Sequence, residues 1–341
     1  MQSTALIGMD LGKQSFHLHG QDGRGKALWR KKLNRKQLME FFATLEPCTV
    51  VMEACAGAHW MARKLTGFGH EAKLISPQFV RPFVKGNKND FVDAEAICEA
   101  ASRPSMRFVS PKTETQQTLS ALHRVRESFI RDRTRAVNQI HGFLLEFGIS
   151  LPTGMAVIKR LPVVLSEHAL PPRMVAILEG LHSHVSYLSE RIAEIDKEMS
   201  RQLAEDDLGQ RLLTMPGVGL VTASILAAEM GDGKQYGCGR DFAASLGLVP
   251  RQYSTGGKAN LLGISKRGDK NIRRLLVQCA RSYMQRLDRQ TGQLAHWVRS
   301  MLLRRHSNVV ACALANKLAR IAWALANRHT QFNAGPDLKT A

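Results

Sequence analysis

Hydrophobic and polar residues alternate in two different patterns along the first hundred positions. Apolar or alternating stretches typical of β-strands cover residues 4–11, 15–22, 27–33, 48–54 and 71–76. Helical patterns, with apolar residues three or four positions apart, cover residues 34–45, 58–69 and 90–102. In chain order these stretches predict a three-stranded meander, a helix, and two further pairs of strand and helix. We expect an α/β domain over residues 1–110.

A helical pattern replaces the strand signals from about residue 111. Apolar residues recur at helical intervals between residues 119 and 147, and a connector containing Pro and Gly follows at residues 149–172. Between residues 181 and 203 the apolar positions advance by 4, 3, 4, 3, 4 and 4 residues, close to a heptad repeat. The pattern predicts two antiparallel helices joined by a long loop, in a coiled-coil spacer over residues 111–208. These positions can pair within one chain or between chains, so an oligomer is compatible with them.

A third region, residues 209–330, is predicted to be all-α. It contains the sequence PGVG between two apolar helical segments, a pattern typical of a helix-hairpin-helix element. Gly217 and Gly219 would let the turn approach a phosphate, which backbone N–H groups at the next helix end would bind. The alternative is a plain helical hairpin with a Pro-Gly turn. Residues 331–341 are expected to be a disordered tail.

The chain is strongly basic. It has 48 Lys and Arg residues against 29 Asp and Glu residues, a formal net charge of +19 over 341 residues. Such a surplus favours a polyanionic partner, because Lys and Arg side chains displace condensed counterions from nucleic acid and steer its approach. A basic protein without such a partner is the alternative. With 44% hydrophobic residues the chain can bury substantial cores.

Membrane segments and zinc sites are not expected. The sequence shows no unbroken run of about 18 apolar residues and no signal peptide, so we expect a cytoplasmic, nucleoid-associated protein without a membrane partner. The six cysteines form no CxxC pair and are interpreted as small buried residues. His17 and His19 share one face of a predicted strand, but no third zinc ligand lies nearby in the sequence.

Basic residues concentrate in one predicted helix and one predicted loop. Five arginines fall within a dozen positions of the first spacer helix: Arg124, Arg126, Arg131, Arg133 and Arg135. They either form a solvated charged face or follow a phosphate backbone, and the net charge favours the second interpretation. A segment after Pro250, rich in Ser, Thr, Gly and Lys, predicts a mobile basic loop between helices. The basic residues of this loop are Arg251, Lys258, Lys266 and Arg267.

Four acidic residues lie where predicted elements begin or end. Asp10 and Glu53 each terminate an apolar strand, where an isolated charge is costly to bury. Asp90 and Asp93 are three positions apart at a helix start, where their simplest role is an N-cap at Asp90 with a second acid in support. The element order is that of an RNase H-like domain, in which these two strands are neighbours and the helix crosses near them. The four acids would then converge on Mg²⁺, with two ions about 4 Å apart as the arrangement suited to a phosphodiester.

Two features of this region and of the basic loop have alternative interpretations. The sequence DLGK at residues 10–13 also occurs in the first hairpin of actin-like ATPases and sugar kinases, but the helical second half offers no duplicated domain. In the basic loop, Ser254 and Thr255 lie between Arg251 and Lys258. Ser254 is either a hydrogen-bond donor to phosphate or a nucleophile. As a nucleophile it would need a base from elsewhere, because the loop contains no histidine.

The motifs resemble a known family. GMDLGK, VVMEACAG, KNDFVDAEA, MPGVGLVTA and the segment over residues 242–276 are similar to those of the DEDD transposases of insertion sequences, now called bridge-RNA-guided recombinases. The resemblance covers nearly the whole chain. It implies a RuvC-like N-terminal domain in which Asp10, Glu53, Asp90 and Asp93 bind Mg²⁺. It also implies a C-terminal transposase domain in which Ser254, aligned through the STGG segment, attacks DNA and forms a phosphoserine link.

The resemblance also implies partners. A structured noncoding bridge RNA would pair with double-stranded donor and target DNA. Dimers would assemble into a tetramer whose active sites combine the acidic domain of one protomer with the serine domain of another. We therefore predict a site-specific DNA recombinase that cuts and rejoins DNA. The alternatives are a RuvC-like structure-specific nuclease with water as nucleophile, and a non-enzymatic nucleic-acid-binding protein.

Overall fold

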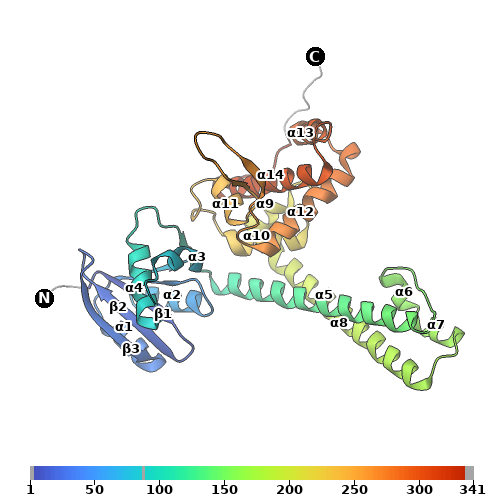
Figure 1. The fold of residues 1–341 in the computed structure, drawn as a ribbon, viewed down its shortest axis with the longest axis horizontal. Helices are drawn as coiled ribbons and strands as arrows, with labels where there is room; N and C mark the ends of the chain where they lie inside the picture. The colour runs from blue at the N-terminus through green and yellow to red at the C-terminus, as the bar shows by residue number, and fades with distance from the viewer. Residues whose placement is uncertain (1–3, 87–88, 335–341) are drawn as a thin grey trace, which may run out of the picture. The chain divides into compact units, whose positions relative to one another are not determined.

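The computed structural model describes residues 4–86 and 89–334 of the 341-residue chain. The chain forms two compact units, which we call the N-terminal unit (Met1–Thr115) and the C-terminal unit (Gln116–Ala341). The N-terminal unit is a mixed α/β domain, and the C-terminal unit is helical apart from one small hairpin (Figure 1). An α/β part followed by a helical part was predicted from the sequence.

A six-stranded mixed sheet forms the centre of the N-terminal unit, in the order β3-β2-β1-β4-β5-β6. The strands are β1 (Leu6–Leu11), β2 (Ser15–Gln21), β3 (Ala27–Asn34), β4 (Thr49–Glu53), β5 (Glu71–Ile75) and β6 (Phe108–Val109). The first three form an antiparallel meander, β4 is parallel to β1, β5 is parallel to β4, and β6 is antiparallel to β5. This topology is consistent with an RNase H-like domain. Because β1 and β4 are parallel neighbours, Asp10 and Glu53 lie at the same edge of the sheet.

Helices cover both faces of this sheet. They are α1 (Arg35–Thr44), α2 (Ala58–Gly67), α3 (Pro77–Val80), η1 (Arg81–Phe83) and α4 (Asp90–Ala101). The predicted Asn34 cap is confirmed as a capping box, in which the Asn34 side chain accepts from the Gln37 N–H and the Gln37 side chain accepts from the Asn34 N–H. Ile7, Met9 and Phe16 pack in one core with residues of α1 and α2.

The α4 helix lies close to β1 and β2 on the opposite face. Gly8 permits this approach, because a Cβ atom at this position would lie 2.1 Å from the Ala94 carbonyl oxygen and 2.8 Å from Cys98 Sγ. Side chains alternate across a strand, so Asp10 projects to the same face as Gly8. The start of α4 is thereby brought to the end of β1.

Two long antiparallel helices lie mainly in the C-terminal unit (Figure 1): α5 (Glu114–Leu145) and α8 (Pro172–Ala204). Arg126 pairs with Asp196, and seven positions further along α5 Arg133 contacts Ser189, seven positions back along α8. This register gives α5 and α8 opposite directions.

The connector between α5 and α8 contains two short helices: α6 (Met155–Lys159) and α7 (Leu161–Glu167). The sequence predicted a long loop here, and that prediction was wrong. Pro162 lies at the start of α7, where its missing N–H needs no partner. Ile158 is buried against Ile140 of α5 and Leu178 of α8, so the connector forms part of this core.

The remaining helices of the C-terminal unit pack around α14. They are α9 (Asp207–Leu213), α10 (Leu220–Met230), α11 (Gly239–Ser245), α12 (Lys270–Gln285), η2 (Leu287–Arg289), α13 (Gly292–Leu302) and α14 (Ser307–Arg328). Phe332 packs against this core, and its N–H donates to Thr214 Oγ1 at 2.9 Å. The predicted disordered tail therefore begins with residues that contact the C-terminal unit through Phe332. Residues 335–341 of that tail lie outside the described residues.

Among the described residues, α14 is the one helix long and apolar enough to cross a membrane by length and composition. Its 18-residue window has a mean hydropathy of 1.5, and half of the window is buried. Leu314, Leu318 and Ala322 pack in the core of the unit, and α14 contacts α9, α11, α12 and α13. These contacts are those of a buried core helix.

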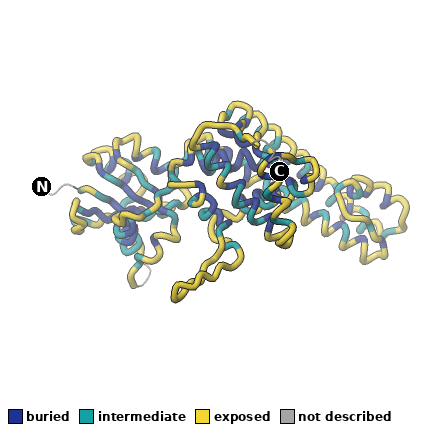
Figure 2. The backbone as a smooth tube through the Cα atoms, turned by 90° about the horizontal axis from the view of Figure 1, so that it is seen from above, coloured by how far each residue is buried: buried dark blue, intermediate teal, exposed yellow. Residues whose placement is uncertain are grey.

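A two-stranded hairpin stands where the sequence predicted a basic loop: β7 (Pro250–Gln252) and β8 (Leu261–Ile264). It extends from the helices of its unit as the orange ribbon of Figure 1, and nearly all of its residues are exposed (Figure 2). Gly268 fixes its base with φ of +103°, and a Cβ atom there would lie 1.7 Å from the Ser245 carbonyl oxygen. The predicted loop is thus a hairpin whose base is closely packed.

Candidate functional site

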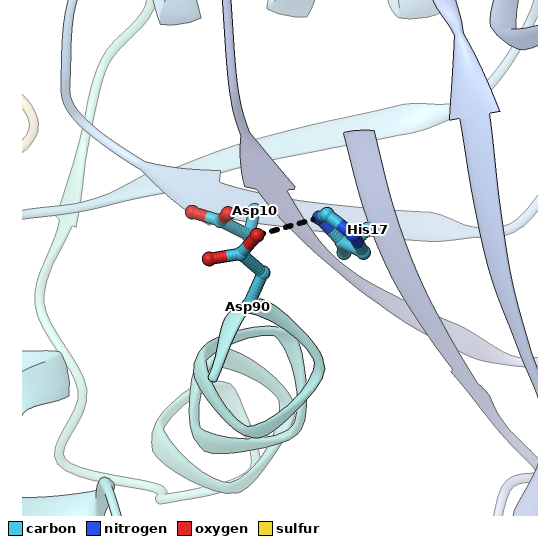
Figure 3. Close-up of side chains that lie close together, drawn as sticks. All are labelled: Asp10, His17 and Asp90. Carbon is cyan, nitrogen blue, oxygen red and sulfur yellow. Dashed lines mark ion pairs between the residues drawn. The ribbon is translucent and has the colours of Figure 1, made fainter. Parts of the chain in front are cut away.

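Asp10, His17 and Asp90 lie together at one end of β1 (Figure 3). One ligand-capable atom of each side chain lies within 4.8 Å of the others. Asp10 comes from β1, His17 from the facing position of β2, and Asp90 from the first turn of α4. Carboxylate oxygens and an imidazole nitrogen at these separations can share a divalent cation.

The first turn of α4 supplies two of the predicted acids. Asn89 caps this helix, because its side chain accepts a 2.9 Å hydrogen bond from the Phe91 N–H. The interpretation of Asp90 as the N-cap was therefore wrong. Asp90 and Asp93 lie inside the first turn and are not needed as caps. The positive end of the helix dipole favours their negative charge.

Glu53 completes the set of acids at this edge of the sheet. Partial burial raises the pKa of Glu53, and the negative charges of Asp10 and Asp93 raise it further. Glu53 ends β4, the parallel neighbour of the strand that carries Asp10, so the two acids lie at the same end of the sheet. Asp90 lies beside Asp10 in the cluster with His17, and Asp93 shares the first turn of α4 with Asp90. We call the four acids at this end of the sheet, Asp10, Glu53, Asp90 and Asp93, the acidic centre. A divalent cation relieves the repulsion in such a cluster, and its oxygen donors suit a hard cation.

His17 adjoins the acidic centre but was not predicted to belong to it. It is 5% exposed, and its Nδ1 lies 3.4 Å from Asp90 Oδ2. Among the described residues, Nδ1 has no well-directed hydrogen-bond partner. His17 was missed because metal ligands were predicted only from residue spacing along a single strand. His17 lies on β2 and faces Asp10 of β1 across the antiparallel pair. A side chain directly opposite a predicted metal ligand is the signal that would have found it.

The cysteines lie apart from one another as free thiols. Their interpretation as buried residues is confirmed for Cys48, Cys98 and Cys279. It was wrong for Cys55 and Cys238, which are exposed. Spacing alone does not distinguish a buried thiol from an exposed one.

Ser254 lies in the exposed turn of the β7-β8 hairpin. Gln252 Nε2 donates a 2.7 Å hydrogen bond to Ser254 Oγ, and Thr255 forms a β-bridge with Lys258. The basic residues predicted for this region are all exposed: Arg251, Lys258, Lys266 and Arg267. Residues 250–264 contain no acid and no histidine, so a base for Ser254 has to come from outside the hairpin.

The five arginines of α5 point in two directions. Arg126 donates to both carboxylate oxygens of Asp196, at 2.5 and 3.2 Å, and Arg133 donates to Ser189 Oγ at 3.4 Å. These two arginines hold α5 against α8. The other three are exposed: Arg124, Arg131 and Arg135. They are seven and four positions apart and therefore share one face of the helix.

The PGVG turn joins α9 to α10. Gly217 has φ of +77°, and a Cβ atom there would lie 2.7 Å from the Cys279 carbonyl oxygen of α12. Gly219 caps α10 with φ of −105°, and a Cβ atom there would meet nothing within 4 Å. Gly217 is therefore required by the packing of the turn, whereas Gly219 borders open space.

Comparison with known proteins identifies the family. A DEDD transposase profile of the IS110 type matches residues 7–149, which include all four acids of the acidic centre. The IS116/IS110/IS902 transposase family matches residues 209–296, which include Ser254. The transposase for insertion sequence element IS1328 of Yersinia enterocolitica is 64% identical over 333 residues, covering 98% of this chain and 100% of that protein. The chain belongs to the IS110/IS116 family of DEDD transposases.

Other relatives of this IS110-family transposase extend the comparison. The transposase for insertion sequence element IS1111A of Coxiella burnetii is 40% identical over 338 residues, covering 98% of this chain and 93% of that protein. The pilin gene-inverting protein of Moraxella lacunata is 22% identical over 248 residues, covering 68% of this chain and 66% of that protein. The transposase is thus an enzyme that cuts and rejoins DNA, in a family that normally uses a divalent metal. The alternative of a non-enzymatic binding protein was wrong.

Proposed function

We propose that this transposase is a site-specific DNA recombinase that acts through a phosphoserine intermediate at Ser254. The observation that carries the proposal is the cluster of Asp10, His17 and Asp90. Glu53 ends the strand beside β1, and Asp93 lies in the same helical turn as Asp90. A basic surface brings the DNA phosphates, and the acidic centre supplies the metal-binding groups that phosphodiester chemistry requires. The relative named as a pilin gene-inverting protein is compatible with a reaction that rearranges DNA.

The acidic centre fits Mg²⁺ in its donor chemistry. Its ligands would be Asp10, Glu53, Asp90 and Asp93, with His17 as a nitrogen donor beside Asp90. Five donors in one cluster are compatible with two ions. When bound, Mg²⁺ neutralises charge that develops on phosphate oxygens and on the attacking and leaving oxygens.

Ser254 performs the covalent step in this proposal. Its hydroxyl proton passes to a carboxylate of the acidic centre, the Oγ atom bonds to phosphorus, and the bond from phosphorus to the leaving sugar oxygen breaks. The leaving oxygen takes up a proton and becomes a free sugar hydroxyl, which restores the carboxylate. A sugar hydroxyl of the exchanged strand then attacks the phosphoserine and releases Ser254 with its proton restored. Arg251 and Lys258 on the same hairpin bind the phosphate oxygens. The acids of one protomer and the serine of another act on the same phosphodiester.

The proposal extends to partners and to domain boundaries. Donor and target DNA are held by the exposed arginines of α5 and by the hairpin, and a bridge RNA selects both DNA sites. Dimers assemble into the active tetramer, and the protein works in the cytoplasm at the nucleoid. The functional domains are residues 1–110, 111–208 and 209–330, the last with a helix-hairpin-helix element at Gly217 and Gly219.

The decisive test replaces the nucleophile and its neighbour separately. In a strand-exchange reaction on a plasmid carrying both sites, Ser254→Ala should abolish recombination and the covalent adduct between protein and DNA, as seen on a denaturing gel. Thr255→Ala is the matched control, because it removes the adjacent hydroxyl, and it should retain both. A wild-type reaction that gives clean nicks without an adduct would instead establish the RuvC-like nuclease, with water as the nucleophile and Ser254 as a phosphate ligand.

A further inference from the structure

A cavity of about 950 Å³ lies at the base of the β7-β8 hairpin in the C-terminal unit. One wall is formed by the strands that flank the turn carrying Ser254, through residues such as Arg251 and Leu262. The opposite wall is one face of α14, with Trp297 of α13 beside it. The proposed reaction gives a role to Arg251 of this lining but none to the cavity itself.

The apolar side chains that line the cavity are partly exposed, because nothing in the described residues packs over them. Val309, Ala313 and Ile321 line it from α14, whereas Leu314 and Leu318 of the same helix are buried in the core on its other side. Val309 is 52% exposed, and Leu262 on the facing strand is 41% exposed. Exposed apolar side chains on two facing elements are typical of a binding site that an apolar surface of a ligand would fill.

The charged part of the cavity has a single sign. Its charged lining residues are Arg251, Lys266, Lys317 and Arg320, and no Asp or Glu is among the described residues that line it. Lys317 Nζ lies 4.5 Å from the centre of the Trp297 ring, and burial together with the charge of Arg320 lowers the pKa of Lys317. An anionic group of the occupant would offset this accumulation of positive charge.

These features select one class of occupant. A flat apolar body with an adjoining anion is the chemistry of a nucleotide, whose base stacks on an aromatic ring and whose phosphate pairs with cations. The four cations of the lining favour an occupant that carries an anion beside its apolar part over a purely apolar segment of protein. We propose that the cavity binds an unpaired nucleotide of the DNA being recombined, with its base against Trp297 and its phosphate at Lys317 and Arg320.

The inference rests on the proposed function, because the nucleotide in the cavity would belong to the DNA strand that Ser254 attacks. Binding a base outside the duplex would fix the register of that strand on the hairpin. The cavity therefore holds the DNA in position, while Ser254 performs the chemistry.

The test uses the full-length protein and a short DNA duplex with one unpaired 2-aminopurine nucleotide. The wild-type protein should bind this DNA about ten-fold more tightly than the fully paired duplex, with quenching of the 2-aminopurine as it stacks. Trp297→Leu and Lys317→Gln should each lose most of this preference. Lys234→Gln is the matched control, because Lys234 is an exposed lysine of the same unit outside the cavity, and it should keep the preference.

Folding defects are separated from binding defects by two further measurements. Trp297→Phe keeps an aromatic ring and should retain the preference, and thermal unfolding of each variant shows whether the fold survives. The inference is overturned if the wild type binds both duplexes equally, or if Lys317→Gln weakens both to the same extent. Preference for an unpaired nucleotide in RNA but not in DNA would also overturn it.

Repeating the measurement with Ser254→Ala distinguishes this inference from the proposed function. If this variant still recombines DNA and keeps the preference, the nucleophile assignment is wrong and the cavity assignment stands. If Trp297→Leu and the wild type give the same preference and the same adduct, the cavity assignment is wrong and the phosphoserine mechanism stands.

Discussion

His17 shows how a single buried residue extends the acidic centre. If its imidazole binds the metal, His17→Gln should weaken Mn²⁺ binding about ten-fold, an effect expected when a ligand or its direct support is removed. Mn²⁺ substitutes for Mg²⁺ and is detected by electron paramagnetic resonance, where a nitrogen ligand produces a ¹⁴N coupling. The wild type should show this coupling and His17→Gln should not.

His19→Gln is the matched control for this prediction. His19 lies two positions along the same strand and is engaged by Gln21 and Arg30, at 3.2 and 3.4 Å. This variant should keep the ¹⁴N coupling. A wild-type Mn²⁺ complex without any nitrogen coupling would show that His17 only orients Asp90.

The sequence pattern correctly placed the acids at the ends of elements, because Asp10 and Glu53 end buried strands and Asp90 and Asp93 begin a helix. The structure brings Asp10 and Asp90 together, and the shared metal site of all four acids stays a prediction. His17 was missed because its contact depends on the register of a hairpin, which places it opposite Asp10. Sequence spacing along one strand gives no information about a neighbour on the next strand.

His123 couples the stability of the C-terminal unit to pH. It is 4% exposed, and its Nε2 shares a 3.0 Å hydrogen bond with Ser224 Oγ of α10. Burial and the charge of Arg126 lower the pKa of His123 to about 4, against the weaker opposite effects of Glu229 and Asp196. Between pH 6.5 and 4 the unfolded chain binds a proton at this position that the folded chain does not bind. The contribution of neutral His123 to the free energy of unfolding is therefore fully present above pH 6.5. It is lost as the pH falls from 6.5 towards 4.

The prediction for His123 is a smaller loss of stability at low pH when the residue cannot titrate. Between pH 7 and 4.5 the wild type should lose about 2 kcal/mol more than His123→Gln, which keeps a hydrogen-bonding side chain. Hydrogen exchange of α10 amides at increasing urea concentration measures this difference directly. Equal losses in the two proteins would mean that His123 is protonated in the fold.

The turn between α9 and α10 allows packing and phosphate binding to be tested separately. Gly217→Ala places a Cβ atom in a left-handed backbone 2.7 Å from a carbonyl oxygen of α12, so it should cost roughly 2 to 4 kcal/mol of stability. Gly219→Ala borders open space at an ordinary φ and should cost less than about 1 kcal/mol. Urea unfolding monitored through α12 compares the two variants.

DNA affinity then decides whether this turn binds phosphate. If the helix-hairpin-helix interpretation holds, Gly219→Ala should weaken DNA binding several-fold while the protein stays folded, because a methyl group would obstruct the backbone N–H groups at the start of α10. Unchanged affinity in Gly219→Ala would leave the turn as a plain helical hairpin.

Long elements were easier to predict than short ones. In the N-terminal unit, β1 to β5 and the helices α1, α2 and α4 were predicted, because runs of five or more residues carry a readable hydrophobic pattern, whereas the short α3 and η1 were not. No such pattern marks β6, which has two residues, or the hairpin strands, which have three and four mainly exposed residues. The α6 and α7 helices were missed because Pro and Gly were interpreted as loop residues, although Pro162 begins a helix. Tertiary contacts, rather than local pattern, stabilise these short elements.

For the molecule as a whole, the net charge of +19 predicts DNA affinity that falls steeply with salt. The contribution of α5 to DNA binding can be measured separately, because two of its arginines contact α8 and the other three lie on an exposed face. Replacing Arg124, Arg131 and Arg135 together by Gln should reduce the slope of log affinity against log salt by about 2 to 3, or about 0.9 for each phosphate that is no longer neutralised.

Arg126→Gln is the control for this salt dependence. Arg126 is bound to Asp196, with 19% of its side chain exposed, so its replacement leaves a partly buried carboxylate unpaired. This variant should unfold more easily and keep the wild-type salt slope. Arg131 and Arg135 also pair with acids of their own helix, at 3.2 and 2.9 Å, but both arginine side chains are largely exposed, so these pairs contribute little stability. A phosphate can displace such weak partners, whereas the pair of Arg126 with Asp196 resists displacement. If the triple variant keeps the full slope, DNA does not follow α5, and the positive charge that binds it lies elsewhere on the protein.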